Sequence, residues 1–149
     1  MNPFDIKTVL FAKHAQHVVL VHFPIALCIT GVAFDFLARW TRRHTLAAAA
    51  YLNIFAAAIL ALPVLATGLL AWQWRLEGQR LKGTLLLHLV LACVSSAMIW
   101  LVWWLHFRLR RRTQGAVPAY LLLVELLAVG LMAITAHLGG FLSGVNVPG

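Results

Sequence analysis

Three histidines lie within long apolar stretches of the sequence, where ionisable side chains are rare. They are His22, His88 and His137. An ionisable side chain at membrane depth is costly, so each of them is a candidate functional residue. Imidazoles that meet at one level from different helices of a bundle can ligate a metal ion or the iron of a haem. We therefore take these three residues as candidate ligands.

The depth of the histidines follows from the apolar segments that carry them. We expect four membrane spans, over residues 15–40, 45–74, 83–107 and 117–142. At a rise of about 1.5 Å per residue, each histidine lies roughly 7 Å inside the same end of its span. The predicted fold is all-α, a transmembrane four-helix bundle that forms one integral membrane domain over residues 1–149.

The composition excludes a soluble protein and predicts an orientation. The 149 residues are 62% hydrophobic and 11% charged, too apolar for a soluble domain. The net charge of +8 does not indicate nucleic-acid binding, because the arginines lie in short connections between apolar segments. The first and third turns carry Arg42, Arg43, Arg108, Arg110, Arg111 and Arg112. By the positive-inside rule these turns face the cytoplasm, and both termini face the periplasm of a bacterial inner membrane.

The surroundings of the histidines favour haem over a bare metal ion. The residues that share the helix face of His137 are Gly130, Ala133, Gly140 and Gly144. Such small residues leave room for a flat macrocycle, and they would equally allow close helix packing. Arg75, Arg80 and Lys82 lie just outside the membrane on the same side, where they suit haem propionates. Zinc or copper is less favoured, since no carboxylate or cysteine shares the histidine layer.

The first span contains a second histidine, His17, that competes with His22. The two residues are five positions apart, about 140 degrees around a helix, so both point at one centre only if Pro24 distorts the helix. Pro24 also frees the carbonyl of Leu20, which can bend the helix close to His22. We therefore expect His22 to be the ligand.

Other polar residues give weaker signals. Asp35 and Arg39 are four positions apart and can pair on one helix face. Glu125 is expected to pair with an arginine of the cytoplasmic turns, although a proton site is the alternative. His44 and His106 belong to the cytoplasmic side. No nucleophile with a base, phosphate loop or paired carboxylates is evident in the sequence, so hydrolysis and phosphoryl transfer have no support.

The chain contains two cysteines. Cys28 and Cys93 lie inside apolar segments and are expected to be small apolar fillers. The first and third spans each place a histidine five or six residues before a cysteine, which hints at two similar hairpins. Two matched pairs arise easily by chance in apolar sequence, so the hint has little force.

Three short motifs carry a family resemblance. They are VHFPIAL at 21–27, ATGLLAW at 66–72 and AHLGG at 136–140. With these motifs the chain resembles, over nearly its whole length, a bacterial family of four-span membrane proteins catalogued as domain of unknown function 2231. The resemblance implies a four-helix inner-membrane protein with His22 and His137 in family motifs, and it implies no reaction. His88 lies outside those motifs.

These observations lead to one main hypothesis and its alternatives. The main one is a b-type haem module that is ligated by two of the three histidines. It would transfer single electrons between the quinol pool, or a partner subunit, and a periplasmic carrier such as a cytochrome. The alternative is a non-catalytic structural or assembly subunit of a larger redox or photosynthetic membrane complex, in which the histidines form a hydrogen-bonded layer. A quinol-oxidising enzyme is a third hypothesis, although an electron-transfer or accessory subunit is expected before a stand-alone enzyme.

Overall fold

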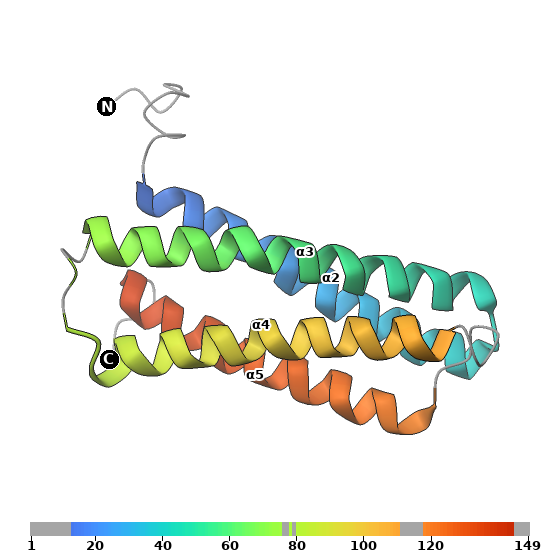
Figure 1. Cartoon of the computed structure of the whole chain (residues 1–149). Coiled ribbons are helices and arrows are strands. Elements are labelled where there is room, and N and C mark those ends of the chain that lie inside the picture. Colours follow the sequence, from blue (N-terminus) through green and yellow to red (C-terminus); the bar gives the residue numbers. More distant parts are fainter. Residues whose placement is uncertain (1–12, 76–77, 79, 111–117, 145–149) are drawn as a thin grey trace.

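The computed structural model describes residues 13–75, 78, 80–110 and 118–144. Its elements are four long helices: α2 (Lys13–Thr41), α3 (His44–Arg75), α4 (Gly83–Arg110) and α5 (Ala119–Ser143). Successive helices run antiparallel, so that α2 and α4 begin, and α3 and α5 end, at the same end of the bundle (Figure 1). We name this the terminal end. The opposite end is named the arginine-rich end after Arg39, Arg42, Arg43, Arg108 and Arg110.

All four helices are long and apolar enough to cross a membrane. The candidate spans contain 25 to 30 residues each, and about 20 suffice to cross the hydrocarbon core of a bilayer. Within the most apolar stretch of each span, only 17% to 28% of the residues are buried inside the bundle. The remaining apolar side chains face outward, where lipid would cover them. The chain is therefore a multi-pass membrane protein, and the predicted all-α four-helix fold is confirmed.

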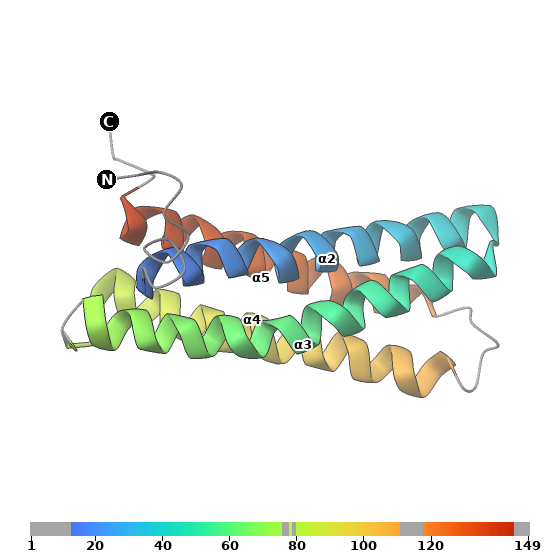
Figure 2. The same cartoon turned by 90° about the horizontal axis from the view of Figure 1, so that it is seen from above.

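The helices pack in a ring in which each one contacts two others. Helix α2 packs against α3 and α5, and α4 packs against the same two helices, so α2 and α4 lie diagonally across the bundle (Figure 2). The α2–α3 interface is built from small residues, among them Gly31, Ala50, Ala57 and Ala58, all of them buried. Within a membrane the hydrophobic effect does not drive helices together. Small side chains let two helix backbones approach closely and so increase the van der Waals packing between them.

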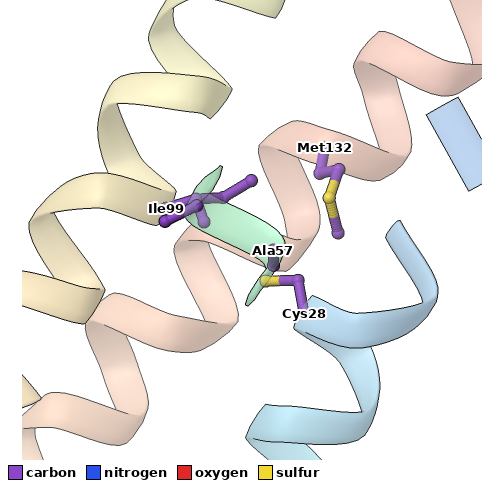
Figure 3. Packing of buried hydrophobic residues seen from close by; sticks show 5 residues of the cluster. Cys28, Ala57, Ile99 and Met132 are labelled. Atoms are coloured by element: carbon purple, nitrogen blue, oxygen red, sulfur yellow. The ribbon is translucent and has the colours of Figure 1, made fainter. Parts of the chain in front are cut away.

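The buried positions of the first hairpin, α2–α3, recur 71 residues later in the second, α4–α5. Cys28 corresponds to Ile99, and Ala61 corresponds to Met132; all four are buried. Figure 3 shows side chains from all four helices, Cys28, Ala57, Ile99 and Met132, meeting in one apolar layer. The faint repeat in the sequence is thus present in the packing, but its register pairs His88 with His17 rather than with His22. Cys28 is an apolar filler of this layer, whereas Cys93 is exposed, and both are free thiols.

The close approach of α2 and α3 makes Gly31 a sensitive position. A Cβ atom there would lie 2.7 Å from Cγ1 of Ile54 and 3.3 Å from the carbonyl oxygen of Ala50. Because Ile54 is fully buried, it has no space into which to move. We expect Gly31→Ala to lower the free energy of unfolding by about 1–3 kcal/mol, the usual cost of overpacking. Thermal unfolding in detergent, followed by circular dichroism, measures this loss.

Gly130 on α5 provides the matched control. A Cβ atom at Gly130 would meet nothing within 4 Å, so Gly130→Ala is expected to leave the stability unchanged or to raise it. Equal losses of stability in the two variants would contradict the close packing of α2 on α3.

Candidate functional site

A cavity of about 380 Å³ lies in the terminal half of the bundle. Residues of all four helices line it, and most of them are apolar. Three histidines are among them, His17 and His22 from α2 and His88 from α4. Small-molecule sites in proteins usually have volumes of about 300–1,000 Å³, so this cavity has the size and character of a binding site.

His88 is held in the cavity wall by the neighbouring helix α5. Its Nδ1 lies 3.0 Å from the backbone oxygen of Thr135. A Cβ atom at Gly139 would come within 3.1 Å of Cε1 of His88, so the imidazole packs directly against the glycine backbone. The buried hydroxyl of Ser95 lies 3.0 Å from Oγ1 of Thr135 and connects α4 to α5 at the same level. The ring orientation of His88 is therefore fixed by backbone atoms of α5.

His17 is held by α3 in the same way. Its Nδ1 lies 3.1 Å from the backbone oxygen of Val64 and 3.2 Å from Oγ1 of Thr67. A Cβ atom at Gly68 would lie 3.0 Å from Cε1 of His17. In both hairpins the acceptor carbonyl lies 47 residues after the histidine, and the contacting glycine follows four residues later. His17 and His88 are therefore equivalent residues of the repeat.

These hydrogen bonds determine the tautomer of the two imidazoles. A carbonyl oxygen only accepts, so Nδ1 of His17 and of His88 carries the proton and donates it. The lone pair is then on Nε2. Metal-bound histidines use this arrangement, in which the second ring nitrogen donates to a carbonyl and orients the ring. The two residues come from diagonal helices and line one cavity.

The other predicted site residues lie at different places. His22 lines the cavity but is exposed, and its Nδ1 donates to the backbone oxygen of Val18 on its own helix at 2.7 Å. Gly140 also lines the cavity. His137 is exposed, is not among the lining residues, and packs edge to face on Phe141 with ring centroids 4.9 Å apart. The structure thus brings His22 and His88 to one cavity and leaves His137 outside it.

The predicted cations lie in or beside the α3–α4 connection. Arg80 is exposed there, at the terminal end. The side chain of Arg75, at the end of α3, lies outside the part of the chain whose side chains are described. Ligation of a cofactor by any of the predicted residues stays a prediction.

On α2 the sequence favours His22 over His17 as the candidate ligand. The presence of Pro24 favoured His22, but the rotation of α2 in the bundle turns His17 toward α3. The signal that could have found it is the common spacing of 51 residues from His17 to Gly68 and from His88 to Gly139. That spacing identifies the repeat and pairs His17 with His88.

A second polar cluster lies near the arginine-rich end. Asp35, His106 and Glu125 come from α2, α4 and α5, and only 2%, 3% and 0% of their surfaces are exposed. Nε2 of His106 lies 2.5 Å from Oε1 of Glu125. Arg39, one turn after Asp35, interacts electrostatically with both carboxyl groups. Sequence alone predicted an arginine as the partner of Glu125, whereas its hydrogen-bond partner is His106.

Comparison with known proteins supports the family resemblance. Neither the curated proteins nor the solved structures contain a match to the chain. The family model described as predicted membrane protein (DUF2231) matches residues 13–146, which include all four helices. On this match, the chain belongs to the DUF2231 family of predicted membrane proteins.

Proposed function

We propose that the chain is a b-type haem module that transfers single electrons within the membrane. The observation that carries the proposal is the equivalence of His17 and His88. Both imidazoles line one cavity from diagonal helices, and both donate Nδ1–H to a backbone carbonyl 47 residues further along the chain. The partners would be the quinol pool, or a partner subunit, on one side and a periplasmic carrier on the other.

The hydrogen bonds of their Nδ1 atoms favour His17 and His88 as the residues that would hold the haem. Each would present Nε2 to the iron while its Nδ1–H bond holds the ring plane. His22 is the less suitable residue of α2, because its ring is exposed and donates to a carbonyl of its own helix. His137 is outside the cavity lining and has no ligand role in this proposal.

The remaining lining fits a flat macrocycle. Gly140 presents little side-chain bulk at the α5 wall, while Gly139 and Gly68 are covered by the rings of His88 and His17. Arg80 and Lys82 are exposed at the terminal end, where they can pair with propionates. The haem, once bound, supplies the one-electron chemistry. The protein supplies two imidazoles, a mostly apolar wall that limits access of water, and cations at the rim.

The arginines favour a cytoplasmic location for the arginine-rich end. Short cytoplasmic loops of membrane proteins carry an excess of Lys and Arg. The cavity would then lie near the periplasmic leaflet of a bacterial inner membrane, within reach of a soluble carrier on that side.

The absorption spectrum tests the haem proposal. Protein purified from haem-replete cells should show the reduced-minus-oxidised bands of a b-type cytochrome. His17→Ala and His88→Ala should each lower the bound haem by at least about tenfold, because loss of even an outer-shell partner of a metal ligand costs about 10–100-fold. His137→Ala, in which the changed residue lies outside the cavity, is the control and should keep the spectrum.

Two results would contradict the haem proposal. A colourless wild-type protein that also fails to bind added haemin would favour the alternative of an accessory subunit. Loss of the bands in His137→Ala but not in His17→Ala would contradict the assignment of the ligands.

Reporter fusions test the orientation. Alkaline phosphatase folds to its active form in the periplasm, so a fusion after Gly149 should be active. Green fluorescent protein fused at the same position by the general export route should be dark. The physical reason is the cost of moving the arginine-rich turns across the membrane. A fluorescent fusion with inactive phosphatase would reverse the proposed orientation.

A further inference from the structure

The buried cluster of Asp35, His106 and Glu125 is separate from the residues that line the cavity. We propose that this carboxylate–histidine cluster binds a divalent transition-metal ion, with one ligand from each residue. The proposal concerns the arginine-rich half of the bundle and does not depend on the haem.

The positions of the ligand atoms fit a single ion. One carboxylate oxygen of Asp35, one of Glu125 and one ring nitrogen of His106 all lie within 4.8 Å of one another. Bonds from zinc to nitrogen and oxygen ligands measure about 2.0–2.2 Å, so two ligands of a tetrahedral ion lie about 3.3–3.6 Å apart. Movements of up to roughly 1 Å would therefore bring the three atoms onto one ion. The three residues project from three different helices, as ligands in helix-bundle metal sites do.

Unpartnered oxygen atoms give independent support for a cation. Oδ2 of Asp35 and Oε2 of Glu125 are buried and have no hydrogen-bond partner among the described residues. Their side chains are 2% and 0% exposed, so bulk water is not a ready substitute. A buried carboxylate oxygen that lacks a hydrogen bond is costly, even though His106 bonds the other oxygen of Glu125 and Arg39 interacts with both carboxyl groups. A metal ion that both carboxylates ligate would compensate these two oxygens.

The charges of the side chains in and beside the cluster indicate the charge of the ion that it would bind. Two carboxylates balance the charge of one divalent ion, while Arg39, which interacts with both of them and whose Nε is buried, is the cation that the ion would have to displace. Ligation by His106 uses the lone pair of Nε2. The proton that Nε2 shares with Glu125 in the metal-free form must then move to Nδ1 or leave the site.

The donor atoms of the cluster restrict which metal ions it can bind. One imidazole and two carboxylates suit Zn²⁺, Mn²⁺ or Fe²⁺ better than the all-oxygen preference of Mg²⁺ or Ca²⁺. The internal repeat of 71 residues also distinguishes this cluster from the cavity. Asp35 and His106 occupy equivalent positions of the two hairpins, and so do Ile54 and Glu125. The site therefore combines unlike residues, whereas the cavity combines two like ones.

Metal titration of the full chain tests the proposal. The protein is purified in detergent with a tag that lacks histidine, stripped with a chelator, and titrated with Zn²⁺ and with Co²⁺. We expect about one ion per chain by elemental analysis, visible d–d bands of Co²⁺, and a rise in the unfolding temperature when Zn²⁺ is added. Asp35→Asn and Glu125→Gln should each weaken binding by at least about tenfold.

The variants separate loss of the site from loss of the fold. Asp35→Asn keeps the volume of the side chain and leaves the His106–Glu125 hydrogen bond in place, so its metal-free form should unfold near the wild-type temperature. His44→Ala removes an exposed histidine at the same end of the bundle and should bind metal like the wild type. His88→Ala should also bind normally, whatever its effect on the haem spectrum.

The proposal is overturned by either of two results. One is a wild-type protein that binds neither Zn²⁺ nor Co²⁺ and gains no thermal stability from them, which would mean that the cluster holds protons alone. The other is undiminished binding in both Asp35→Asn and Glu125→Gln, which would place the ion elsewhere.

Discussion

Lipid offers no hydrogen bonds to a side chain, and this constraint organises the whole bundle. Polar side chains are costly in lipid, and the described hydrogen bonds between the side chains of different helices lie at two levels inside the protein. The level near the terminal end comprises His17, Thr67, His88, Ser95 and Thr135; the level near the arginine-rich end comprises Asp35, His106 and Glu125. An apolar layer around Cys28, Ile99 and Met132 separates them. The fold is therefore two polar sites stacked along one apolar bundle.

The internal repeat explains how the terminal site is built. Each hairpin holds its own histidine by a backbone carbonyl and a glycine of its second helix, so each half of the site is preformed within one hairpin. Packing α2 diagonally to α4 then brings the two imidazoles to one cavity. Backbone atoms orient the rings, so the ring positions do not depend on the rotamer of any flexible partner. Such preorganisation would suit the haem site proposed above.

Some of this architecture could be predicted from the sequence and some could not. Four apolar segments predict four helices, and the rise per residue gives the depth of His88 in the membrane. Depth alone does not give the direction in which a side chain points. The choice between His17 and His22 depended on how α2 is rotated against α3, which is set by contacts between residues 47 and more positions apart. Pro24 was a local signal and said nothing of the contacts that hold His17 against α3.

The pairing of His106 with Glu125 was not predicted from the sequence, because it too depends on how two helices pack against each other. Each residue stands alone among apolar neighbours, beside turns rich in arginine, so a local reading offered an arginine as the partner of Glu125. The register of α4 against α5 decides otherwise. Only the repeat spacing would have revealed that Asp35 and His106 occupy equivalent positions facing the same interior.

The two polar levels differ in how closely they follow the repeat. Near the terminal end both hairpins carry a histidine, whereas in the buried cluster Asp35 of the first hairpin is equivalent to His106 of the second. Electrostatics accounts for this difference. Neutral imidazoles can be duplicated across the bundle without repulsion, so His17 and His88 remain alike. Two like charges about 4 Å apart at an effective dielectric constant of 20 repel by about 4 kcal/mol. The buried cluster already contains this repulsion, between Asp35 and Glu125. The base at His106, which is equivalent to Asp35, offsets the repulsion, whereas a third carboxylate at that position would add to it. Glu125, which occupies the position equivalent to Ile54, gives this base a hydrogen-bond partner, so the second hairpin carries both members of the buried pair.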